Sequence, residues 1–187
     1  NTLPSVEVFN EEGEQILGNL KQLFLSAIWN SFIADAILRT KVTCHLNFFY
    51  VYQLPVPRLT EKDPMFVPIV TRSARLICTT PEFDALAQEV GLESHKNGVT
   101  EPEERARLRA ELDGLIAHLY GLTEKEFVYI LTTFPLVDQQ VKDAAIKAYR
   151  RFAGDPEIVA LIAQGEGGVI EFKETANNQE KKGIIKT

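Results

Sequence analysis

The chain has 187 residues, of which 45% are hydrophobic and 25% charged, a composition typical of a globular protein with a substantial core. Its apolar runs are far shorter than the roughly 20 residues of a membrane-spanning helix, and no signal sequence opens it. Two cysteines and three scattered histidines argue against a disulfide framework and a zinc site. We therefore expect a cytoplasmic protein that does not bind membranes.

The net charge of −6 argues against a surface that binds a polyanion over its whole extent. The charges are unevenly distributed, however. Residues 39–75 contain six basic and two acidic side chains, whereas residues 82–126 contain eleven acidic and five basic ones. A polyanion would meet the 39–75 region first. The alternative is that these are ordinary solvated surface charges.

The N-terminal part is predicted to contain one helix and one strand. Residues 1–13 alternate like a strand or the entry to a loop. From Glu14 to about Arg39, apolar residues recur at mostly helical spacing. Residues 46–52 are aromatic and β-branched, as in a buried strand, and Pro55 and Pro57 form a stiff connector after it. The aromatic side chains suit either a core or stacking on bases.

Helices dominate beyond the connector. Phe66–Cys78 and Asp138–Phe152 have apolar side chains at helical spacing. Between them, Thr80-Pro81-Glu82 is a helix start with a capping hydroxyl, and Gly91 ends that helix. A last short helix is predicted to start at Asp155-Pro156-Glu157.

Two capping boxes predict two further helix starts. Thr100-x-x-Glu103 opens a helix with one apolar face, which Gly121 closes. Thr123-x-x-Glu126 opens the next helix, which Pro135 stops. The predicted fold is therefore mainly α, a helical bundle with a small β element near residues 44–53.

Composition divides the chain into three segments. Residues 1–58 contain the helix and the strand, and residues 59–164 form a helical domain. Residues 165–187 form a flexible linker or the start of a further domain, because Gln164–Gly168 is rich in glycine. The only methionine is internal and the C-terminal pattern is unfinished, so we expect a piece of a longer protein.

The sequence contains no complete catalytic constellation. It lacks a glycine-rich nucleotide-binding turn after a strand and an Asn/Asp-Pro-Pro-aromatic loop that would hold a flipped base. Glu171 and Lys173 lie on a predicted strand and form half of a Mg²⁺-dependent nuclease arrangement. The alternative is that both are surface positions of an ordinary strand.

Two blocks of sequence resemble a known family. The first is Asn30-Ser31-Phe32, Arg39-Thr40-Lys41-Val42, Leu46-Asn47-Phe48-Phe49 and Gln53-Leu54-Pro55-Val56-Pro57. The second is residues 108–123 with Tyr129-Ile130-Leu131-x-Thr133-Phe134-Pro135. They resemble, in the same order, the end of the target-recognition domain and the C-terminal helical segment of adenine-specific DNA methyltransferases of type II restriction-modification systems. Residues 165–175 resemble the opening strand of Schlafen/AlbA-like nucleic-acid-binding domains.

The resemblance implies that residues 1–58 end a DNA target-recognition region. The chain would then be a noncatalytic DNA-recognition and scaffold segment, with double-stranded DNA and a methyltransferase core of the same or a partner chain as its partners. S-adenosylmethionine would bind that core, and this chain would hold no cofactor, no metal and no catalytic residue. The residues expected to contact phosphates or a groove are Arg39, Lys41, His45, Asn47 and Arg58.

Two other functions stay open. One is a protein-interaction module whose helical bundle docks on a methyltransferase or nuclease partner, with the acidic 82–126 region facing away from DNA. The other is a Mg²⁺-dependent nuclease fragment that uses Glu171 and Lys173.

Overall fold

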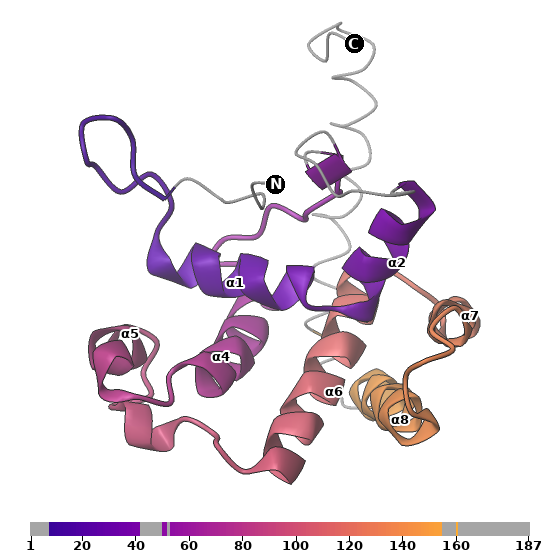
Figure 1. Ribbon diagram of the computed structural model, residues 1–187. Helices are drawn as coiled ribbons and strands as arrows, with labels where there is room; N and C mark the ends of the chain where they lie inside the picture. Colours follow the sequence, from indigo (N-terminus) through magenta and orange to yellow (C-terminus); the bar gives the residue numbers. More distant parts are fainter. Residues whose placement is uncertain (1–7, 42–49, 52, 155–159, 161–187) are drawn as a thin grey trace, which may run out of the picture.

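The computed structural model describes residues 8–41, 50–51, 53–154 and 160. Within these residues the fold is mainly helical, as predicted, and Figure 1 shows the helices packed around one another. The helices are α1 (Asn19–Trp29), α2 (Phe32–Lys41), α4 (Phe66–Ile77), α5 (Asp84–Glu89), α6 (Pro102–Leu119), α7 (Glu124–Thr132) and α8 (Gln139–Gly154). Short 3₁₀ helices span Pro81–Phe83 and His95–Asn97.

Helix α6 is the central element of the bundle. It packs against α2, α4 and α8, while α1 lies along α4 and α7 lies beside α8 (Figure 1). Every residue from Ala110 to Ala117 is buried, including Glu111 and Asp113. The sequence predicts one apolar face for this helix, but the buried surface is wider. Three other helices cover α6 from different sides.

The backbones of α6 and α8 approach each other closely at Gly114. A Cβ atom built on this glycine would lie 2.8 Å from the backbone nitrogen of Tyr149 and 3.0 Å from the carbonyl carbon of Ala148. Real Cβ atoms do not come so close to backbone atoms. The absence of a side chain at Gly114 thus sets the separation of the two helices.

The single helix predicted over Glu14–Arg39 is wrong, because the structure has two helices that meet at Ser31, and α1 begins only at Asn19. The Ser31 hydroxyl donates to the Ile28 carbonyl at 2.7 Å and accepts from the Ala34 backbone N–H at 3.2 Å. One side chain therefore ends α1 and caps α2.

The strand predicted near residues 44–53 is wrong where the structure describes it. Tyr50 and Val51 are helical, and the Leu54 N–H donates to the Val51 carbonyl at 3.1 Å. Residues 42–49 and 52 lie outside the described part of the chain. Aromatic and β-branched runs fit a buried helical turn as well as a strand, because strand propensity depends strongly on context.

The two predicted capping boxes have different outcomes. At the start of α7, the Glu126 carboxylate accepts from the Thr123 N–H at 2.8 Å, and the Thr123 hydroxyl accepts from the Glu126 N–H at 3.4 Å, so this box is confirmed. The box at Thr100 is wrong. Helix α6 begins instead at Pro102, with Glu101 as the N-cap and no side-chain cap, because proline at the first position needs no hydrogen bond of its own.

Other helix ends follow the predicted signals in part. Gly91 and Gly121 have φ angles of 77° and 64° and follow α5 and α6, as expected for glycine at a helix end. The Thr80 hydroxyl makes no capping bond to the backbone, and a 3₁₀ helix precedes α5. Val141 is exposed, although its spacing predicts an inward position. The helix predicted at Asp155 lies outside the described residues.

One core spans the predicted boundary between residues 58 and 59. Apolar side chains of α1 and α2 pack with those of α4, α6, α7 and α8 in a single cluster. Its largest fully buried members include Phe66, Phe127, Ile28, Met65, Ile69, Leu115 and Ile116. The core therefore holds the end of α2 and the connector after residue 53 against the rest of the bundle.

We expect Gly114→Ala to destabilise the protein by about 2 kcal/mol, since overpacking a close contact typically costs that much. The added methyl group would meet the α8 backbone, which cannot rotate away as a side chain can. Urea unfolding measures the free energy of unfolding. The control is Gly154→Ala, because nothing lies within 4 Å of a Cβ at that position. Equal stability of both variants would contradict the close helix contact.

Candidate nucleic-acid interface

Arg39, the first predicted DNA-binding residue, is already engaged within the protein. Its guanidinium donates to both carboxylate oxygens of Asp35, at 2.9 and 3.0 Å, one helical turn away. The same group lies 4.7 Å from the ring centre of Phe134. The hydrogen bond to Asp35 raises the pKa of Arg39, followed by the charge of that carboxylate. Its positive charge is therefore largely balanced before any ligand arrives.

Lys41 and Arg58 carry charge closer to the connector. The Lys41 ammonium donates to the Gln53 side-chain oxygen at 3.1 Å, which places the end of α2 beside the start of the connector. Arg58 is exposed and makes no hydrogen bond or ion pair in the part of the chain that the structure describes. These two side chains are more available to a polyanion than Arg39.

Two of the five predicted contact residues, His45 and Asn47, lie outside the described residues, as do Glu171 and Lys173 of the nuclease alternative. Arg39 and Lys41 both lie in the last turn of α2 but point in different directions, and Arg58 lies at the far end of the connector.

Asp113 joins the two blocks of the family resemblance. Its carboxylate accepts from the Phe32 backbone N–H at 3.0 Å, so a side chain of α6 caps the first turn of α2. The Phe32 ring packs edge-on against Phe134 with 4.9 Å between ring centres. Both contacts link residues of the first block to residues of the second.

Tyr120 makes the other link between the blocks. Its hydroxyl donates to the Pro55 carbonyl at 2.7 Å, which holds the connector against the end of α6. Burial raises the pKa of Tyr120, so the group stays a neutral donor at ordinary pH. The connector is therefore anchored by Lys41 at its start and by Tyr120 two residues further on.

His118 is part of the packing of α6 against α8. Its Nε2 lies 2.9 Å from the Tyr149 carbonyl, and its ring stacks on the Tyr149 ring with 3.9 Å between centres. Burial lowers the pKa of His118. A carbonyl can only accept, so Nε2 carries the proton and the neutral imidazole bridges the two helices. These contacts describe a structural histidine rather than a general base.

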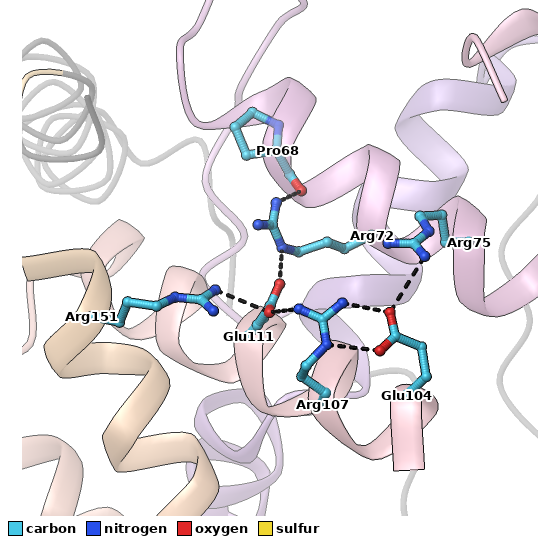
Figure 2. Close-up of polar contacts among 7 residues, drawn as sticks. All are labelled: Pro68, Arg72, Arg75, Glu104, Arg107, Glu111 and Arg151. Carbon is cyan, nitrogen blue, oxygen red and sulfur yellow. Dashed lines mark hydrogen bonds and ion pairs between the residues drawn. The ribbon is translucent and has the colours of Figure 1, made fainter. Parts of the chain in front are cut away.

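Sequence reasoning missed a cluster of charged residues around Glu111, shown in Figure 2. Arg72 of α4, Arg107 of α6 and Arg151 of α8 all converge on this buried carboxylate. The four-residue spacing of Arg107 and Glu111 on one helix is a readable signal of a pair. The contributions of Arg72 and Arg151 come from other helices and leave no local pattern.

No family model, curated protein or solved structure matches the chain. Among the described residues, no helix is long and apolar enough to cross a membrane. The same residues contain no group of three or more His, Cys, Asp or Glu side chains that could hold a metal ion.

We expect the stability of the protein to fall as the pH rises from about 4 to about 7, because of Asp113. Burial raises the pKa of Asp113 from 3.8 to about 7, against the lowering effects of the Phe32 N–H and the Arg109 charge. Folding therefore favours the protonated acid, and this stabilisation is lost as the pH approaches the folded-state pKa. The loss is at most about 4 kcal/mol, since one pKa unit corresponds to about 1.4 kcal/mol.

Asp113→Asn tests this expectation. An amide oxygen can still accept from the Phe32 N–H, but the side chain no longer ionises. The variant should therefore be more stable than the wild-type protein at pH 8 and should lose this part of the pH dependence in urea unfolding. The control is Asp143→Asn, a change of the same kind at an exposed position of α8. Identical pH profiles for the wild-type and Asp113→Asn proteins would contradict the assignment.

Proposed function

We propose that this chain is a noncatalytic DNA-recognition and scaffold segment of a site-specific adenine DNA methyltransferase of a restriction-modification system. One observation carries the proposal: the two sequence blocks that resemble this family are bonded directly to each other. Asp113 of the second block caps α2 at Phe32 of the first. Tyr120 of the second block holds Pro55 of the first. The residues that carry the resemblance thus build one joint.

The contacts of Asp113 and Tyr120 with the first block support a scaffold role. Asp113 fixes where α2 starts, and Tyr120 fixes the connector that leaves the other end of the first block. The basic side chains at the end of α2 and on the connector are consequently held by the buried core of α6. Such support on a packed framework keeps contact residues in place.

The proposed interface consists of Lys41 and Arg58, with Arg39, His45 and Asn47 as further members. Lys41 and Arg58 would contact phosphates, while Arg39 would first have to release Asp35. S-adenosylmethionine and the methyl transfer belong to the separate methyltransferase core, which would work with this segment in the cytoplasm. This division of labour agrees with the lack of a complete catalytic constellation in the sequence.

The double variant Lys41→Glu with Arg58→Glu should weaken binding to duplex DNA at about 50 mM salt by roughly tenfold or more, because phosphate contacts release counterions. The slope of the logarithm of the affinity against the logarithm of the salt concentration should also become shallower by about 1 for each lost contact. Fluorescence anisotropy of a labelled duplex, titrated with the chain at about 50 and about 200 mM salt, measures both quantities.

The matched control is Lys96→Glu, which changes an exposed lysine of the His95–Asn97 helix, beside α5 and away from α2 in Figure 1. This variant should bind DNA almost as the wild-type chain does. Circular dichroism should show the same helix content for all variants. An unchanged affinity of the double variant would contradict the proposed interface, and no binding at either salt would contradict DNA recognition by this chain.

A protein-interaction module is the second candidate, favoured by an exposed apolar surface near α7. Tyr129 is 71% exposed and Leu136 is 98% exposed. A shallow hollow of about 400 Å³ lies beside Tyr129 and is also lined by Leu122, Lys125, Glu126 and Ile130. An exposed aromatic side chain beside such a hollow is typical of docking surfaces. The partner would be the methyltransferase core.

Tyr129→Glu should abolish co-purification of this chain with its methyltransferase core when the two are produced as separate chains. The change would bury a charge in an apolar contact, which is strongly unfavourable. The control is Val67→Glu, because Val67 is also exposed but lies on α4. Loss of co-purification with both variants, or with neither, would argue against the α7 surface.

A further inference from the structure

Glu111 is a carboxylate buried between three helices, with only 3% of its surface exposed. Figure 2 shows guanidinium groups reaching it from three sides. Arg72 Nε donates to Oε2 at 2.8 Å, while Arg107 and Arg151 contact Oε1 at 2.5 and 3.0 Å. A buried carboxylate needs partners, but three guanidinium groups on one charge are more than neutralisation requires.

Arg72 and Arg107 make further contacts that hold their guanidinium groups in place. Arg72 also donates to the Pro68 carbonyl of its own helix at 3.0 Å, so it links α4 to Glu111 of α6. Arg107 donates to both oxygens of Glu104, so it is shared between two carboxylates. Glu104 also accepts from Arg75 of α4 at 3.4 Å, so the cluster holds four arginines and two carboxylates.

Arg151 is the most exposed of the four arginines in this cluster. It makes a single contact with Glu111, and 52% of its side chain is exposed. Its guanidinium lies 4.7 Å from the ring centre of Phe152, which holds the planar group in a fixed orientation. Exposed Lys147 precedes it by one helical turn, so a second positive charge lies on the same side of α8.

Two half-exposed guanidinium groups thus lie side by side on one carboxylate oxygen. Arg107 and Arg151 are 49% and 52% exposed, and both touch Oε1 of Glu111. Each guanidinium has five N–H donors, so Arg151 retains several that face away from Glu111. A tetrahedral phosphate can accept from two guanidinium groups at once, and its charge would relieve the repulsion between them.

We propose that Arg151, oriented by Glu111 and Phe152 with Arg107 beside it, binds a backbone phosphate of duplex DNA. This rests on the proposed function for the source of the phosphate. It adds an anchoring point on α8, formed by a different group of side chains from that at Lys41 and Arg58. Glu111 acts as a positioning residue, because it orients the arginines and does not itself meet the phosphate.

The test compares Arg151→Gln with Arg150→Gln. The two neighbours lose the same charge from the same helix, and both are exposed, but Arg150 is paired with Glu124 at 2.7 Å, away from Glu111. Anisotropy titrations of a labelled duplex should show roughly fivefold weaker binding for Arg151→Gln and a salt dependence shallower by about 1, as expected for one lost phosphate contact. Arg150→Gln should bind almost as the wild-type chain does.

A second variant separates the effect of the positive charge from that of the guanidinium geometry. Arg151→Lys keeps the positive charge but loses the planar fork, so its salt dependence should match the wild type while its affinity falls between the wild type and Arg151→Gln. Thermal unfolding of the full chain checks that all three variants are folded. Equal affinities for Arg151→Gln and Arg150→Gln would overturn the proposal.

Inorganic phosphate distinguishes a failure of this site from a failure of DNA recognition. Millimolar phosphate should raise the melting temperature of the wild-type and Arg150→Gln proteins more than that of Arg151→Gln, because a bound ligand stabilises the folded state. If the wild-type chain binds no duplex but shows this difference, the anion site stands and the DNA source is wrong. If the chain binds duplex but neither assay separates the two variants, the site is wrong and the proposed function stands.

Discussion

The close contact between α6 and α8 at Gly114 is the constraint on which the rest of the bundle depends. It lets α6 lie at the centre, covered by α2, α4 and α8. Acidic side chains that would otherwise face water are consequently buried there, and each must find a partner on another helix. Glu111 finds arginines of α4 and α8, while Asp113 finds the first backbone N–H of α2. The polar contacts between helices are therefore a consequence of the close packing around α6.

Local signals in the sequence predicted the parts of the fold that local interactions determine. The Thr123 capping box and the glycines at positions 91 and 121 act within a single helical turn, and the structure confirms them. The break between α1 and α2 was missed because Ser31 and the distant Asp113 create it together. The described end of the predicted strand, Tyr50 and Val51, is helical instead, since an aromatic and β-branched run does not by itself fix the conformation of a segment.

The candidate site was predictable to a smaller extent. The sequence identified the basic residues at the end of α2, but it did not identify the Asp35 partner that balances Arg39. A four-residue spacing of Asp35 and Arg39 on a helix favours such a pair, so this signal was present. Around Glu111, the spacing of Arg107 gave such a signal, but Arg72 and Arg151 gave none, because they come from two other helices. Side chains that meet across a bundle become neighbours only once the packing is known.

The spacing of Asp113 and Tyr120 has a consequence for how this segment can vary. These residues are two helical turns apart, so they project from the same side of α6 and reach the two ends of one block. Insertion or deletion of a single residue between them would rotate one relative to the other by about 100° and break one of the two contacts. Changes of length in related chains should therefore avoid this interval and fall in the loops before Pro102 or after Thr132.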